Sequence, residues 1–134
     1  MKQKKFVLDA YPLLVFFKKQ KNWDFVSEII TEAMENKVYL SITTINLGEI
    51  YYNLLKELGK DHAEKTLNAI YMIPISIIDS DWELTKQAAI FKSKGGISYA
   101  DCFAGALAKR EKATLVTGDN EFQLLENEIE ILWI

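Results

Sequence analysis

Carboxylates are the side chains in this sequence that are best placed to do chemistry. Asp9 directly follows Phe6-Val7-Leu8, and Asp119 closes the run Thr114-Leu-Val-Thr-Gly-Asp119. Acids that follow buried parallel strands lie at the edge of the sheet where α/β proteins bind their ligands. Each aspartate also fits an N-cap, for a helix starting near Tyr11 or for residues 120–125. Taken alone, these two patterns favour neither interpretation.

Asp101 lies at the start of an expected helix over residues 99–112, and Ser98 precedes it with the spacing of a capping box. This helix has an apolar stripe on one side and small, uncharged residues beside Asp101 on the other, so it should be packed on both sides. An ionised carboxylate in such surroundings needs partners, which favours a cleft. Glu49 lies on the polar face of an expected helix over 44–58, and that pattern alone indicates a solvent-exposed charge.

Three or four carboxylates that converge at strand ends cannot all ionise without a compensating positive charge. Mg²⁺ or Mn²⁺ suits a set of oxygen ligands, and both cations support hydrolysis of phosphodiesters. The sequence offers no competing chemistry, because it contains no GxxxxGK[ST], GxGxxG or GxSxG motif. A single histidine, His62, and a single cysteine, Cys102, exclude multi-His and Cys-cluster metal sites.

The elements that would position these acids alternate along the chain. Short runs rich in β-branched or aromatic residues predict buried strands, and the segments between them are long enough for crossover helices. Strands that alternate with helices predict a parallel sheet covered on both faces. The expected strands are residues 6–8, 38–42, 75–78, 114–117 and 129–134.

Three helix starts are also predicted from capping residues. Asn22 is expected to cap a helix that runs to residue 37. Ser80 and Glu83 have capping-box spacing before residues 84–94, and Gly95-Gly96 should end that helix. Ser98 should open the helix that carries Asp101.

Four segments occur in a characteristic order. They are Val7-Leu8-Asp9-Ala10, then Ser41-Ile42-Thr43-Thr44 leading to Glu49-Ile50, then Ile97-Ser98-Tyr99-Ala100-Asp101-Cys102, and finally Leu115-Val116-Thr117-Gly118-Asp119 with Phe122 after it. As a set they resemble the PIN domain, and most closely the toxin ribonucleases of the VapC type. The resemblance covers nearly the whole chain. It implies a single domain over 1–134 with a three-layer α/β/α fold around a central five-stranded parallel sheet.

The resemblance also implies an Mg²⁺- or Mn²⁺-dependent endoribonuclease. Its pocket acids, which would bind the metal and act in catalysis, would be Asp9, Glu49, Asp101 and Asp119, with Thr117 and Ser98 in supporting roles. It moves Glu49 from a solvent-exposed face into a cleft. Some members of the family carry a further acid just after the third one. Here uncharged residues follow Asp101, so we expect four carboxylates.

Toxins of this type usually form homodimers and are silenced by an antitoxin whose tail covers the pocket. We therefore expect an RNA substrate, an antitoxin partner and a homodimer. Two alternatives stay open: a stand-alone RNA-processing PIN nuclease, and a non-catalytic PIN-like binding module. A haloacid-dehalogenase-like phosphatase is disfavoured, because Tyr11 stands where its second aspartate would be. A response-regulator receiver domain would need an acidic pair that the sequence does not show.

The charge of the chain argues less strongly against RNA than its total suggests. Sixteen basic and nineteen acidic residues give a net charge of −3, whereas a nucleic-acid binder usually carries a basic surface. Without the four expected pocket acids, the remainder carries +1. Basic residues at 18, 19 and 21, at 92 and 94, and at 109, 110 and 112 are candidate RNA contacts. The sequence shows no secretion signal and no long apolar run, so we expect a cytoplasmic protein that does not enter membranes.

Overall fold

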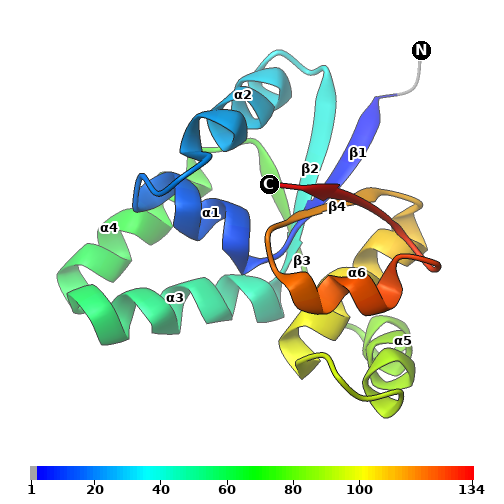
Figure 1. Cartoon of the computed structure of the whole chain (residues 1–134). Helices are drawn as coiled ribbons and strands as arrows, with labels where there is room; N and C mark the ends of the chain where they lie inside the picture. The colour runs from blue at the N-terminus through cyan, green and yellow to red at the C-terminus, as the bar shows by residue number, and fades with distance from the viewer. Residues whose placement is uncertain (1–2) are drawn as a thin grey trace.

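The computed structural model describes residues 3–134, and its strands and helices alternate as predicted (Figure 1). The strands are β1 (Lys4–Leu8), β2 (Val38–Thr43), β3 (Ile75–Ile78), β4 (Thr114–Thr117) and β5 (Glu130–Trp133). The α-helices are α1 (Ala10–Phe17), α2 (Trp23–Met34), α3 (Thr44–Leu58), α4 (Lys60–Tyr71), α5 (Trp82–Ser93) and α6 (Tyr99–Glu111), and a 3₁₀ helix, η1 (Asn120–Leu125), follows β4.

All five strands are parallel and lie in the order β3-β2-β1-β4-β5, so the predicted sheet is confirmed. The central strand β1 pairs with β2 on one side and with β4 on the other. Val7 is the partner of Ser41, and Leu8 is the partner of Val116. Because the three strands run in the same direction in this register, the residues that follow them meet at one edge of the sheet.

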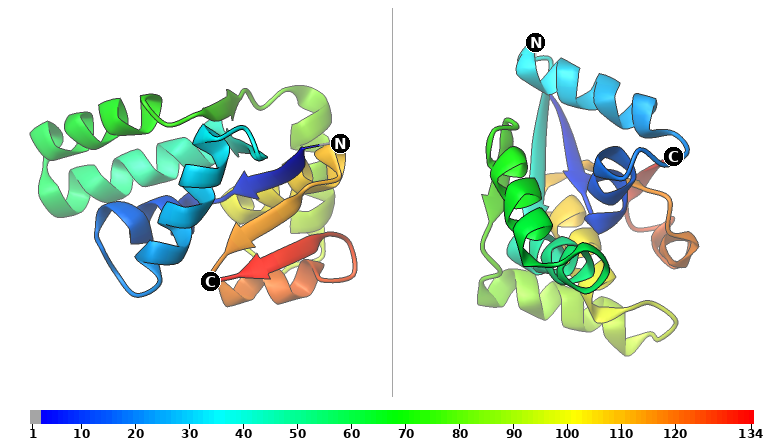
Figure 2. Two further views of the ribbon diagram at one scale, coloured as in Figure 1. Left: turned by 90° about the horizontal axis from the view of Figure 1, so that it is seen from above. Right: turned by 90° about the vertical axis from the view of Figure 1, so that its left-hand side faces the viewer.

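Alternation along the strands divides the core between the two faces of the sheet. Phe6 and Leu8 pack in a cluster with residues of α1, α2, α3 and α4. Val7 and Leu115 point to the other face and pack in a second cluster with α5 and α6. Figure 2 shows helices on both sides of the sheet, which confirms the predicted three-layer α/β/α architecture.

Two of the predicted helix starts need correction. The N-cap of α5 is Asp81 rather than Ser80, because the Asp81 carboxylate accepts a hydrogen bond from Leu84 N at 2.8 Å. Aspartate and serine are comparable caps, so the sequence pattern does not decide which of these two neighbouring residues caps the helix. Asn22 occupies the N-cap position of α2, but its backbone is left-handed, with φ 73°, and its side chain makes no capping bond.

The other expectations for the helices hold where the structure tests them. Ser98 caps α6 by accepting a hydrogen bond from Asp101 N at 3.2 Å, and residues 101–108 are all buried, as expected for a helix packed on both sides. No helix within residues 3–134 is long and apolar enough to cross a membrane. That residues 1–134 form a single domain stays a prediction.

Candidate active site

Asp9 lies at the carboxyl end of the central strand and is nearly inaccessible, with 2% of its surface exposed. It is the N-cap of α1, and its Oδ1 accepts a hydrogen bond from Tyr11 N at 3.2 Å. Its Oδ2 accepts a second bond, at 2.8 Å, from the hydroxyl of Thr117 at the end of β4. The two interpretations left open for Asp9 are therefore compatible, since one carboxylate both caps a helix and lies in the candidate site.

Thr117 joins the ends of β1 and β4. Its Oγ1 donates to Asp9 and accepts a hydrogen bond from Asp119 N at 3.0 Å. This buried hydroxyl donates one hydrogen bond and accepts another, so it fixes Asp9 relative to the turn that carries Asp119. Asp119 in turn caps η1, because its Oδ1 accepts from Glu121 N at 3.0 Å.

Asp101 and Glu49 come from the helices beside this edge. Asp101 lies in the first turn of α6 and is 4% exposed, whereas Glu49 on α3 is half-buried. Asn46, one turn before Glu49, is fully buried and donates from Nδ2 to the carbonyl of Ala100 at 3.1 Å. This bond holds α3 against the first turn of α6 and brings the segments that carry Glu49 and Asp101 together.

Glu121 is a fifth acid at this edge, and the sequence reasoning missed it. Carboxylate oxygens of Asp101, Asp119 and Glu121 all lie within 4.8 Å of one another. Glu121 Oε1 also accepts a hydrogen bond from Ser98 N at 2.8 Å, which ties η1 to the start of α6. The only signal in the sequence was its position two residues after Asp119, in a helix too short to recognise from periodicity.

Burial and the charges of neighbouring acids raise the pKa values of three of these acids. Burial raises the pKa of Asp9 to about 8, and the charges of Asp119 and Glu49 add to that rise. Burial also raises the pKa of Asp101, as do a hydrogen bond with Asp119 and the charge of Asp9. The pKa of Glu49 is raised by burial and then by the charge of Asp119. Asp9, Asp101 and Glu49 therefore hold their protons to a higher pH than isolated carboxyls do.

A hard divalent cation fits this arrangement. All the donors are carboxylate oxygens, three of them are close enough to share one ion, and none of the ion pairs within residues 3–134 involves these acids. Mg²⁺ and Mn²⁺ prefer oxygen ligands, whereas Zn²⁺ sites in proteins usually include histidine or cysteine. Cys102, although adjacent to Asp101, is buried in the apolar cluster, and burial raises its pKa to about 11.

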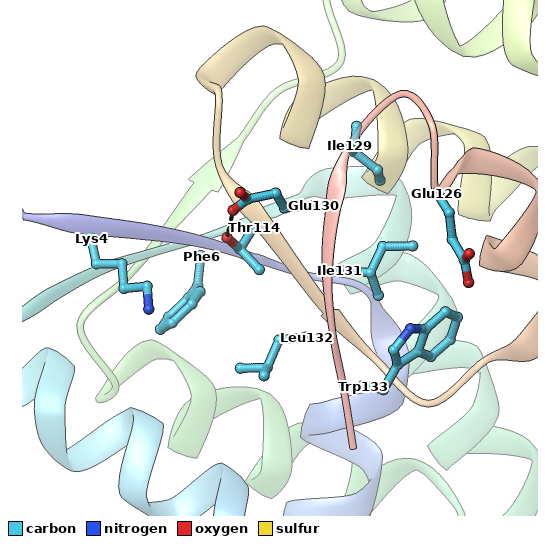
Figure 3. A pocket seen from close by; sticks show the side chains of 9 residues that line it. All are labelled: Lys4, Phe6, Thr114, Glu126, Ile129, Glu130, Ile131, Leu132 and Trp133. Atoms are coloured by element: carbon cyan, nitrogen blue, oxygen red, sulfur yellow. Dashed lines mark hydrogen bonds between the residues drawn. The ribbon is translucent and has the colours of Figure 1, made fainter.

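A separate hollow of about 490 Å³ lies beside the edge strand β5, between residues of β1, β4 and β5 (Figure 3). None of the acids described above lines it. Some of its lining side chains already contact one another, because Thr114 donates to Glu130 and the Lys4 ammonium lies over the Phe6 ring. The hollow therefore lacks the converging ionisable groups that mark the edge near Asp9.

Four of the eight basic residues that were candidate RNA contacts form ion pairs. Lys18 pairs with Glu57 at 2.7 Å, and Arg110 pairs with Asp81 at 3.1 Å. Glu128 pairs with both Lys94 and Lys109. These contacts reduce the number of free cations available to a phosphate backbone.

Comparisons with known proteins agree with this fold. The chain is similar to VapBC2 from Rickettsia felis, solved bound to a DNA fragment from its promoter, with a TM-score of 0.76 and 20% identity over 97% of this chain and 98% of that chain. It is similar to Mycobacterium tuberculosis VapC20, a sarcin-ricin loop cleaving toxin, with a TM-score of 0.69 and 12% identity over 88% and 92% of the two chains. It is also similar to FitAcB from Neisseria gonorrhoeae, with a TM-score of 0.68 and 17% identity over 95% and 96%. No curated protein sequence matches the chain.

The family is shown by the sequence itself. The PIN domain family model matches residues 6–128, a span that includes all five acids at the carboxyl edge of the sheet. The predicted family is thus confirmed, and the chain belongs to the PIN domain family.

Proposed function

We propose that this protein is a divalent-metal-dependent endoribonuclease. The observation that carries the proposal is the convergence of Asp9, Glu49, Asp101, Asp119 and Glu121 at one sheet edge, with pKa values of the buried members raised. Acids arranged in this way are stable in ionised form only with a cation, and a cation held by carboxylates is a binding site for phosphate. Membership of the PIN family and similarity in fold to an RNA-cleaving toxin favour RNA as the substrate.

In this proposal Asp101, Asp119 and Glu121 provide the oxygens that hold the ion, and Asp9 adds a further carboxylate on the opposite side of Thr117. When bound, Mg²⁺ or Mn²⁺ supplies positive charge to the scissile phosphate and makes a nearby water more acidic. Thr117 and Ser98 fix the orientation of the acids through their hydrogen bonds to Asp9 and to Asp101 N. Glu49, the half-buried acid with a raised pKa, accepts the proton of the attacking water.

Cleavage of RNA by matched variants tests this proposal. We expect purified protein to cut RNA with Mn²⁺ and to stop when the metal is chelated. Asp9→Asn and Asp101→Asn should each abolish cleavage, whereas Glu28→Gln, an exposed acid on α2, should leave it unchanged. Cleavage by Asp9→Asn or Asp101→Asn at the rate of the wild type would refute the assignment, because the activity would then come from a contaminant or another site.

We further propose that the protein is the toxin of a toxin–antitoxin pair, acts in the cytoplasm and forms a homodimer. The supporting observation is that the proteins of similar fold include a member of the VapBC family of toxin–antitoxin systems from Mycobacterium tuberculosis and a toxin–antitoxin complex from Klebsiella pneumoniae. Growth arrest on expression, relieved by co-expression of a small DNA-binding protein encoded next to it, is the expected result. Cleavage of RNA without growth arrest would favour the alternative of a stand-alone RNA-processing nuclease. Absence of any cleavage would favour a non-catalytic binding module.

A further inference from the structure

The Tyr11 ring lies at the rim of the acidic site, in a position that a single glycine makes available. Tyr11 is the second residue of α1, and its backbone N–H donates to Asp9. Its side chain turns back over the end of β4, where it covers Gly118. A Cβ atom at Gly118 would overlap the ring carbons of Tyr11 and would lie 2.8 Å from its hydroxyl oxygen. The ring therefore packs directly on the backbone between Thr117 and Asp119.

The backbone conformation at residue 118 does not itself require glycine. Gly59, Gly95 and Gly96 have positive φ angles, and Gly118 is not among them. Glycine is needed at this position because it has no side chain and so leaves room for the aromatic ring. The hydroxyl end of the ring is thus held against the turn that carries Asp119.

Tyr11 is also partly open to solvent. Tyr11 is 40% exposed, although Asp9, two residues before it, is 2% exposed. A large aromatic side chain that is fixed by packing and still exposed offers a rigid surface beside a phosphate-binding pocket. Unpaired nucleobases stack on such surfaces, and each stacked base contributes about 1–3 kcal/mol to binding. The bases of a duplex are stacked on one another and cannot use it.

We propose that Tyr11 is the stacking platform for an unpaired nucleobase of the RNA, next to the phosphate held by the acids, and that Gly118 positions its ring. This inference rests on the proposed function and adds to it a preference for unpaired RNA. The energy of one stacked base corresponds to a loss of about 5- to 150-fold in affinity when the ring is removed.

Binding of two probes of equal charge tests the platform. The probes are a fluorescein-labelled single-stranded oligoadenylate and an abasic ribose-phosphate strand of the same length, measured by anisotropy with Ca²⁺ in place of Mn²⁺. Wild type should prefer the oligoadenylate. Tyr11→Ala should remove most of that preference, whereas Tyr11→Phe should keep it. Gly118→Ala should weaken it without changing any acid, since the new methyl group would take the place of the ring and displace the Tyr11 side chain.

Tyr71→Ala is the control, because Tyr71 is an exposed tyrosine far from the acids. It is 57% exposed at the end of α4, just before the start of the outer strand β3. It should behave as the wild type. If Tyr11→Ala keeps the full preference for oligoadenylate, the inference about Tyr11 is overturned and the proposed function is not affected. Equal affinity of the wild type for both probes would also overturn it, and would leave Tyr11 as a contact for a protein partner. Failure of the wild type to bind either probe or to cleave RNA would overturn the proposed function together with the inference.

Discussion

Asp9→Asn should stabilise the metal-free protein while it destroys the metal site. The folded protein holds the Asp9 proton up to about pH 8, because burial raises its pKa, whereas an unfolded chain loses that proton near pH 4. Between these values the unfolded state binds fewer protons, so the stability that Asp9 contributes below pH 4 is lost as pH rises. The loss is about 1.4 kcal/mol per pH unit, so a rise from about pH 4 to pH 7 lowers the free energy of unfolding by roughly 4 kcal/mol.

An asparagine at position 9 avoids this fall in stability with pH and can still form two hydrogen bonds. Its amide oxygen can accept from Tyr11 N, and its amide nitrogen can donate to the Thr117 hydroxyl oxygen, which then accepts from both residue 9 and Asp119 N and no longer donates to residue 9. Asparagine is also as good an N-cap as aspartate. We therefore expect Asp9→Asn to stabilise the metal-free protein near pH 7 by up to about 4 kcal/mol, with no gain near pH 4.

Urea denaturation in the presence of a chelator, near pH 5 and near pH 8, measures this effect. Wild type should be less stable at the higher pH, and the variant should vary less. Added Mn²⁺ should stabilise the wild type, by about 4 kcal/mol at a thousandfold excess over Kd, and should not stabilise the variant. Metal-free wild type that becomes more stable as pH rises would refute the reasoning, since Asp9 would then be ionised in the fold at no cost.

Three further outcomes are expected. Thr117→Val should lower Mn²⁺ affinity about 10- to 100-fold by calorimetric titration, because it removes the hydroxyl that orients Asp9 and Asp119; Thr117→Ser should restore most of it. Glu121→Gln should weaken Mn²⁺ binding yet leave stability unchanged, since an amide oxygen can still accept from Ser98 N; equal Mn²⁺ affinity in this variant would exclude Glu121 as a ligand. Leu107→Ala on α6 should lower the free energy of unfolding by about 2–5 kcal/mol in urea, whereas Leu124→Ala, at an exposed position, should change it by less than about 0.5 kcal/mol.

The sequence predicts best those parts of the site that depend on local structure. Asp9 and Asp119 follow strands directly, so a buried apolar run and a parallel sheet are enough to place both at one edge. Glu49 is different, because its helical phase puts it on a polar face and only the family resemblance assigns it to the cleft. Its position depends on the bond from Asn46 to Ala100, a contact between residues 54 positions apart that no local pattern encodes.

Glu121 could not be predicted for a related reason. It lies on a single short 3₁₀ helix, where charged residues are ordinary, and its approach to Asp101 depends on how η1 packs against α6. That packing is set by Phe122 and Leu125, which are buried in the same apolar cluster as α6. The ring of Tyr11 over Gly118 likewise joins residues at opposite ends of the chain. Such contacts appear only once the sheet has formed.

The acid cluster and the ion pairs together bear on how an acidic protein would hold RNA. With five acids at the site, the rest of the chain carries fourteen acidic and sixteen basic residues, a net charge of +2. Within residues 3–134, five basic side chains are already in ion pairs, among them Lys18 with Glu57 and Arg110 with Asp81. A net charge of this size outside the site gives only a weak general attraction for phosphate. Under the proposed function, the cation would supply the local attraction, and an aromatic surface such as the Tyr11 ring would be the second source of affinity, because stacking is independent of net charge.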